Sequence, residues 1–147
     1  MTVAARDGRR GVGHARFARG RDGETRVDRN SGSPLGNPIR IGGGVTRAQA
    51  CEAAAALPRA PRDDDDAPHR IARRMNLPAD SVCGECTEPG SQAARLDALD
   101  AVATRLAQGR DVHLLRWCYP RRCHADDIRR AAIERAEARV ARVKRRR

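Results

Sequence analysis

The stretch that decides the fold is SQAARLDALDAVATRLAQGRDVHLLRW, residues 91–117. Its first part predicts a helix over residues 91–108 with Ser91 as its N-cap, because apolar side chains recur at spacings of three and four: Leu96, Leu99, Val102 and Leu106. Gly109 is typical of the residue that follows a helix. The remaining VHLLRW, Val112 to Trp117, is predicted as a buried strand.

A second helix is predicted after this strand. The loop CYPRRCH leads into residues 124–143, where one face is apolar and consists of Ile128, Ala132, Ala136, Val140 and Val143. Asp126 and Asp127 lie in its first turn, where negative charge offsets the helix dipole.

Shorter elements are predicted before the deciding stretch. TRVDR (residues 25–29) and IRI (39–41) are predicted as short strands, separated by the turn-rich NSGSPLGNP. Thr46 and Gln49 form a capping-box pattern at the start of a helix that proline ends, and a short helix is predicted at HRIARRMNL. Strands separated by helices indicate an α/β fold: a small sheet of few strands, at least partly parallel and flanked by helices.

The composition predicts one domain with disordered basic ends. Residues 1–23 mix glycine, arginine and aspartate without an apolar period, and are predicted as a disordered basic arm. Residues 24–143 are predicted as a single small α/β domain, in which PRAPRDDDDAPH (58–69) is a flexible acidic linker because its like charges repel one another. Residues 144–147 are predicted as a basic tail.

The net charge of +11 favours anionic partners, and it is concentrated at the two ends of the chain. Leucine, isoleucine, valine and phenylalanine supply only 23 of the 147 residues. The arginine and alanine usage of a GC-rich genome accounts for the same composition. No window approaches the ~18 consecutive apolar residues of a membrane span, and the N-terminus lacks the apolar segment of a secretory signal. We therefore expect a cytoplasmic protein without a membrane partner.

Polar and reactive side chains gather between the last predicted strand and the last helix: Trp117, Cys118, Arg121, Arg122, Cys123, His124 and Asp126. Ligands bind at this edge of open sheets, and a helix N-terminus favours an anion such as phosphate. Arg121 and Arg122 add positive charge, and His124 and Asp126 are candidate catalytic acid/base groups. The alternative is that Asp126 only caps the helix and His124 only bonds a loop carbonyl.

A second group, Arg29 with Gly36, Asn37 and Pro38, is either a tight turn or part of the same site. Together the two groups resemble a small family of unknown function that is common in phages and actinobacteria. Its members have a strand ending in arginine and a W-G-N-P-F turn, and they end with C-W-C, a proline and C-H-A-D. The counterparts here are VDRNSGSPLGNPIRIGGGVTRAQA and LLRWCYPRRCHADDI, with Leu35 and Arg116 as departures from the pattern.

The cysteines permit three interpretations. Cys83 and Cys86 form a C-x-x-C and Cys118 and Cys123 a C-x4-C, so four thiolates are candidate ligands of a structural zinc, with His124 as a substitute. CGEC is also a candidate redox dithiol, although it does not open a helix after a strand. Cys118 activated by His124 is a candidate nucleophile.

The functional hypothesis is a small phage-related protein, in the host cytoplasm if phage-encoded, with one pocket for a nucleotide-like or phosphorylated ligand. The predicted ligand-binding residues are Arg29, Gly36, Asn37, Trp117, Cys118, Arg121, Arg122 and Cys123. Whether such a protein is an enzyme is left open. The alternative is a non-enzymatic accessory protein whose arginine-rich ends bind nucleic acid.

Overall fold

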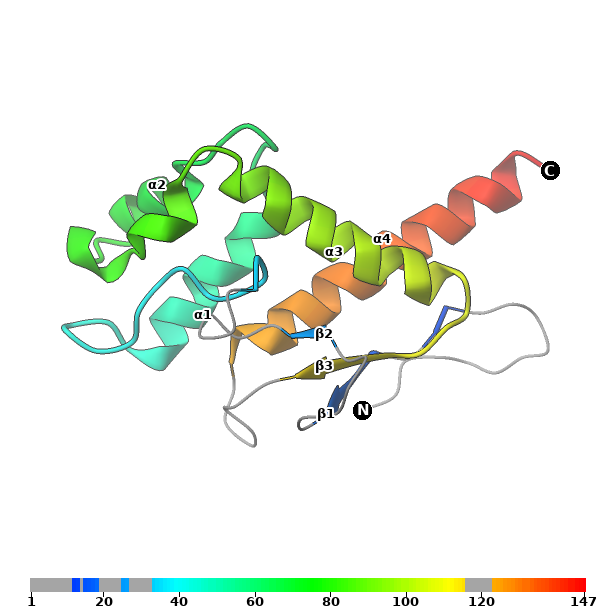
Figure 1. The fold of residues 1–147 in the computed structure, drawn as a ribbon, viewed down its shortest axis with the longest axis horizontal. Coiled ribbons are helices and arrows are strands. Elements are labelled where there is room, and N and C mark those ends of the chain that lie inside the picture. The colour runs from blue at the N-terminus through cyan, green and yellow to red at the C-terminus, as the bar shows by residue number, and fades with distance from the viewer. Residues whose placement is uncertain (1–11, 14, 19–24, 27–32, 116–122) are drawn as a thin grey trace.

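α-Helices and short 3-10 turns together contain most of the residues that the computed structural model describes, which are 12–13, 15–18, 25–26, 33–115 and 123–147. The helices are α1 (Arg47–Ala56), α2 (Ala67–Arg74), α3 (Ser91–Ala107) and α4 (His124–Arg145). Three tight 3-10 turns of the described chain lie between α1 and α3: η2 (Leu57–Arg59), η3 (Ala79–Ser81) and η4 (Gly84–Thr87). The strands β1 (Ala15–Ala18), β2 (Thr25–Arg26) and β3 (Val112–Leu115) pair in parallel in the order β1-β3-β2 (Figure 1).

The α/β class predicted from the sequence is wrong, because the described chain is mostly helical. The helices have 10, 8, 17 and 22 residues, whereas the strands have only 4, 2 and 4. No strand forms at the predicted residues 39–41, where Ile39 makes one isolated bridge to Val82. Gly42, Gly43 and Gly44 follow, all with positive φ, and they turn the chain back so that Gly42 pairs with Val45.

Two stretches inside the predicted basic ends form regular structure, while the disorder of these ends stays a prediction. Ala15–Ala18, inside the predicted arm 1–23, pairs residue by residue with Val112–Leu115. Next to this strand, the N–H of Gly13 donates to the carbonyl of Leu106, and a Cβ atom at Gly13 would overlap the carbonyl oxygen of Arg110. At the other end, α4 continues to Arg145, into the predicted tail 144–147. The rest of residues 1–23 lies mostly outside the described ranges.

The larger core lies between the short strands and the crossed pair α3 and α4 (Figure 1). Leu99 and Leu106 of α3 and Leu114 of β3 are completely buried there. The facing side of α4 is built from small side chains, among them Ala132 and Ala136, which let the two helix axes approach closely. The apolar face predicted for α3 is confirmed, but the face of α4 is buried only in its first part, since Val143 is 55% exposed.

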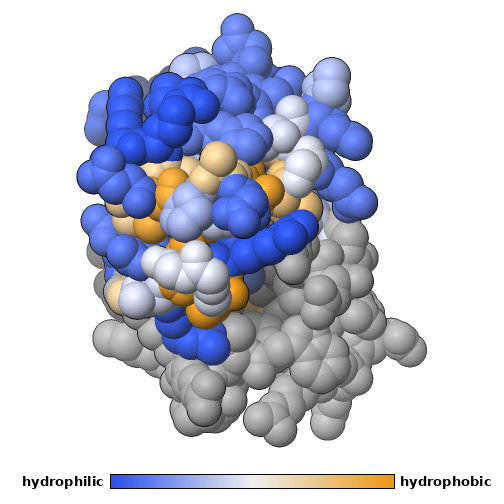
Figure 2. Space-filling view, turned by 90° about the vertical axis from the view of Figure 1, so that its left-hand side faces the viewer, coloured by the Kyte–Doolittle hydropathy of each residue, from blue (hydrophilic) through white to orange (hydrophobic). Residues whose placement is uncertain are grey.

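A second core joins α1 and α2 to the segment before α3. Its members are Ile39, Val45, Ala50, Ala53, Leu57, Ala67, Ile71, Ala72, Leu77 and Val82. Figure 2 views this end of the molecule, where apolar residues show between hydrophilic ones. The capping box predicted for α1 is confirmed: the N–H of Gln49 donates to Thr46 Oγ1 at 3.2 Å, and Gln49 Oε1 accepts the N–H of Thr46 at 2.9 Å.

The start of α3 is capped from a distance by Asp65, not by Ser91 as predicted. The Asp65 carboxylate accepts the N–H of Gln92 at 2.9 Å and the N–H of Gly90 at 3.0 Å. These two bonds hold the pKa of Asp65 below its ordinary value. Asp64 and Asp66 form ion pairs with Arg70 and Arg73 of α2. The predicted acidic linker therefore contacts two helices through its carboxylates, while its flexibility stays a prediction.

We predict that Asp65→Ala lowers the melting temperature at pH 7, because two backbone N–H groups at the start of α3 lose their acceptor. Since the pKa of Asp65 is lowered in the folded state, its stabilising contribution is present above about pH 4 and is lost as the pH falls through the folded-state pKa. The variant should therefore lose less stability on acidification than the unsubstituted chain. Asp63→Ala, at an exposed neighbour, is the matched control for thermal unfolding at pH 7 and pH 3.

We also predict that Leu99→Ala destabilises the chain by about 2–5 kcal/mol, because it leaves a cavity where α3 meets α4 and the strands. Ile41→Ala, which removes a large side chain that is 50% exposed, should change stability by less than about 0.5 kcal/mol. Urea unfolding of both variants measures the difference. Equal losses would contradict the assigned core.

Candidate functional site

The predicted site residues divide into those that the structure describes and those that it does not. Arg29, Trp117, Cys118, Arg121 and Arg122 lie outside the described residues, so their roles stay predictions. The described site residues are Gly36, Asn37, Cys83, Cys86, Cys123, His124 and Asp126.

The two motif groups meet at the start of α4. One ring nitrogen of His124, Nε2, lies 3.1 Å from the carbonyl oxygen of Leu35, which precedes Gly36 and Asn37. The pairing of β2 with β3 is parallel, so the chain leaves both strands at the same edge. The structure therefore brings Leu35, the residue before Gly36 and Asn37, into contact with His124, which lies 89 residues further along the chain.

The contact fixes the tautomer of His124. A carbonyl oxygen only accepts a hydrogen bond, so Nε2 must carry the proton that it donates to Leu35. In the neutral ring Nδ1 is then the basic nitrogen. His124 is partly buried, and in this geometry its first role is to hold the 35–38 turn against α4.

Asp126 closes a capping box at the same place. Its Oδ2 accepts the N–H of Cys123 at 3.2 Å, and its own N–H donates to the Cys123 carbonyl at 3.0 Å. Asp127, beside it in the first turn, is 7% exposed. The contacts of His124 and Asp126 are thus those of the alternative interpretation, a loop carbonyl and a helix cap. Their catalytic roles stay predictions.

Asn37 fixes the turn to α1. Its Nδ2 donates to the carbonyl of Ala50 at 3.2 Å, and its Oδ1 accepts the N–H of Ile39 at 2.9 Å. Leu35, at the position where the family pattern has tryptophan, is 2% exposed and belongs to the larger core. The turn is therefore held on three sides, by α1, by the core and by His124.

The cysteine segment runs alongside this turn. The N–H of Cys83 donates to the carbonyl of Pro38, and the N–H of Arg40 donates to the carbonyl of Ser81, both at 2.8 Å. Among the described residues no group of three or more histidine, cysteine or acidic side chains is placed to hold a metal ion. The zinc prediction also needs Cys118, which lies outside the described residues, so it stays a prediction.

Sequence reasoning missed the buried polar pair Gln92 and Arg95. Gln92 is completely buried and its Nε2 donates to the carbonyl of Leu57 at 2.9 Å, while its Oε1 accepts a bond from Arg95. Arg95 is 4% exposed, its Nε has no hydrogen-bond partner, and burial lowers its pKa. Both residues continue the stripe of Leu96 and Leu99 one turn toward the N-terminus of α3, a signal that could have indicated their burial.

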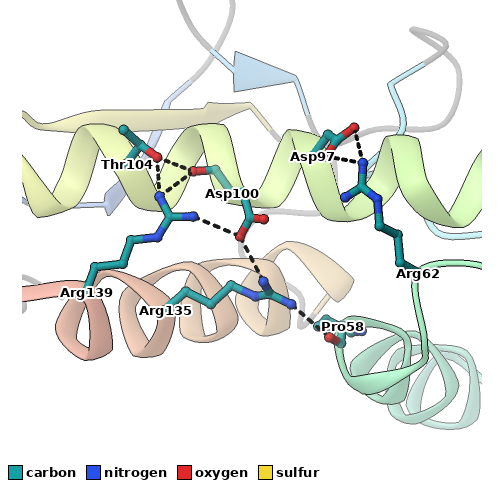
Figure 3. A network of polar contacts seen from close by, with 7 residues as sticks. All are labelled: Pro58, Arg62, Asp97, Asp100, Thr104, Arg135 and Arg139. Carbon is teal, nitrogen blue, oxygen red and sulfur yellow. Dashed lines mark hydrogen bonds and ion pairs between the residues drawn. The ribbon is translucent and has the colours of Figure 1, made fainter. Parts of the chain in front are cut away.

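Beyond Arg129 and Arg130 near its start, α4 and the two residues after it carry two sets of basic side chains. Arg135 and Arg139 both pair with Asp100 of α3, at 2.8 and 3.2 Å respectively (Figure 3). Arg135 also donates to the carbonyl of Pro58 in η2, and Arg139 donates to Thr104 Oγ1 of α3. The last turns of α4 extend past the other helices (Figure 1) and carry the second set, which is exposed: Arg142, Lys144, Arg145, Arg146 and Arg147. None of this second set forms an ion pair within the described part of the chain.

The comparisons with known proteins identify a family but no characterised relative. In the described ranges, no helix has the length and apolar character needed to cross a membrane. No curated protein and no solved structure matches the chain. The family described as a domain of unknown function, DUF4326, matches residues 12–134, which include the turn at 35–38, α3 and the start of α4. The chain therefore belongs to the DUF4326 family of domains of unknown function.

Proposed function

We propose that this protein binds nucleic acid through the basic end of α4. The observation that carries the proposal is the run of five cations within Arg142–Arg147, exposed and without acidic partners in the described chain. Cations at a helix C-terminus also interact favourably with the helix dipole, but one or two suffice for that. Five unneutralised charges on a projecting helix end match the closely spaced phosphates of a nucleic acid.

The first turn of α4 is a less favourable site for an anion than the basic C-terminal end of the helix. Asp126 already accepts one N–H at this helix end, and Asp126 and Asp127 place two carboxylates in the first turn. Both features oppose a phosphate there, because they occupy a donor and repel the anion. The free positive charge of the described α4 is therefore at its C-terminal end.

We predict that binding to duplex DNA depends on these cations specifically. Replacing Arg142, Lys144, Arg145, Arg146 and Arg147 by glutamine should weaken binding and reduce the log–log salt slope by about 4.5, at about 0.9 per phosphate neutralised. Fluorescence anisotropy across a salt series, with several unrelated sequences, measures both quantities. Binding should not depend on the sequence, because the proposed contacts are made to phosphates.

The matched control removes the same charge elsewhere. Its five substitutions to glutamine are at exposed arginines of the body: Arg40, Arg59, Arg74, Arg105 and Arg110. This variant should keep most of the affinity and most of the salt slope. An equal loss in both variants would mean that only the net charge matters, and that outcome contradicts the assigned surface.

A second candidate function rests on the contact between His124 and Leu35. It is the binding of a nucleotide-like or other phosphorylated small molecule at the edge where the 35–38 turn meets α4. In this case His124 positions the turn, and the arginines of residues 116–122 supply positive charge for the phosphate.

We predict for this candidate that His124→Ala weakens binding of a nucleoside monophosphate at least about tenfold, because the turn loses its anchor to α4. Asp126→Asn should strengthen binding, since it removes a negative charge next to the proposed phosphate position. Calorimetry on both variants measures the effects, with the five-glutamine α4 variant as the control that should bind normally. Unchanged affinity in His124→Ala would rule the site out.

A further inference from the structure

The segment around Cys83 and Cys86 carries an inference that is independent of nucleic-acid and phosphate binding. Both residues are present as thiols, Cys83 buried and Cys86 partly exposed. Cys83 lies directly before η4, and Cys86 lies within it. In a C-x-x-C with one accessible and one buried thiol, the accessible sulfur reacts first with a disulfide reagent. The buried sulfur then attacks the resulting mixed disulfide.

The backbone places the two cysteines within reach of each other. The N–H of Cys86 donates to the carbonyl of Cys83 at 3.1 Å, which closes a tight turn. Residues at the two ends of such a turn have Cα atoms less than about 7 Å apart. Disulfides join cysteines whose Cα atoms lie about 4.4–6.8 Å apart, so the turn fits a disulfide with little backbone movement.

Arg95 supplies the second, independent observation. Its side chain is 4% exposed on α3, the helix that packs against η4, and no carboxylate of the described chain forms an ion pair with it. Its Nε lacks a hydrogen-bond partner. Burial lowers the pKa of Arg95, and Cys86 and then Asp65 are the neighbouring groups whose negative charge acts against that shift. A buried cation without a direct counterion is stabilised when a nearby thiol ionises, and the same field favours the reactive thiolate.

We propose that Cys86, with Cys83 as the resolving thiol and Arg95 as the positioning cation, is a redox site that low-molecular-weight disulfides such as oxidised glutathione convert to an intrachain disulfide. The C-x-x-C does not open a long helix here. The buried guanidinium takes the place of the helix N-terminus as the positive group next to the thiol.

The intrachain disulfide forms through two thiol–disulfide exchanges. The Cys86 thiolate attacks one sulfur of oxidised glutathione, the S–S bond breaks, and a Cys86–glutathione mixed disulfide forms as one glutathione thiolate leaves. The Cys83 thiolate then attacks the Cys86 sulfur and releases the second glutathione thiolate. The two cysteines lose two protons and two electrons, and one oxidised glutathione gains them to give two glutathione thiols.

The test uses the full chain in glutathione buffers at pH 7, with alkylation and mass spectrometry as the readout. The unsubstituted protein should accumulate a Cys83–Cys86 disulfide. Cys83→Ser should stop at the glutathione mixed disulfide on Cys86, and Cys86→Ser should form neither. Cys51→Ser, at a buried cysteine of α1, is the control that should behave like the unsubstituted protein.

The role of Arg95 is tested by the rate at which iodoacetamide alkylates Cys86 in the Cys83→Ser background. We expect Cys86 to react at least about fivefold faster than glutathione at pH 7, because its thiolate fraction is larger. Arg95→Gln should slow the reaction and move its pH profile upward, and Arg95→Lys should restore both. Circular dichroism checks that each variant is folded, and if Arg95→Gln unfolds, the Arg95→Lys profile and the Cys83→Ser product decide the question.

Three outcomes would overturn the proposal: a Cys86 that reacts no faster than glutathione, a mixed disulfide that persists in the unsubstituted chain, or one bound zinc per chain that blocks alkylation of both cysteines. The last outcome would instead support the structural zinc predicted from the sequence.

Discussion

The packing of α3 against α4 is the contact on which the rest of the structure depends. The chain has few large apolar residues, and three of its completely buried leucines, Leu99, Leu106 and Leu114, lie where these two helices meet the strands. Alanines on α4 let the helices approach, and partly exposed ion pairs from Arg135 and Arg139 to Asp100 border the contact. Such pairs add little stability, so burial of the leucines does most of the stabilising. A pair of strands as short as β2 and β3 is not stable by itself and depends on this cover.

The two ends of α4 differ in how they contact the rest of the protein. Its first turn is fixed against the 35–38 turn through His124 and closed by the capping box of Asp126. Its last turns have no partner in the described chain, and Val143 and the terminal cations are exposed there. One helix therefore connects two different surfaces. At its start, His124 and Asp126 bond backbone groups of the protein, and at its end the exposed cations have no ion-pair partner within the described residues. This difference is why we propose the basic end as the binding surface.

The start of α3 is a second place where separate segments converge. Asp65 caps the helix, Gln92 bonds the carbonyl of Leu57, and Arg95 is buried beside the C-x-x-C turn. Burying an arginine without a direct ion pair costs folding free energy, so we expect a nearby group that offsets this cost. A thiolate at Cys86 provides that reason, since it would pair with the guanidinium when it forms.

The sequence by itself determined the features that depend on neighbouring residues. The capping box of Thr46 and Gln49, the apolar face of α3 and the break at Gly109 all follow from local spacing, and each lies where it was predicted. Only the tertiary structure decided the contacts between distant residues: Ala15–Ala18 as a strand, the failure of 39–41 to form one, Asp65 as the cap of α3, and His124 on Leu35. The fold class was predicted wrongly for the same reason. Local pattern shows where a strand can form, but its length and stability depend on the helix pair that covers it, and that cover is not visible in the sequence.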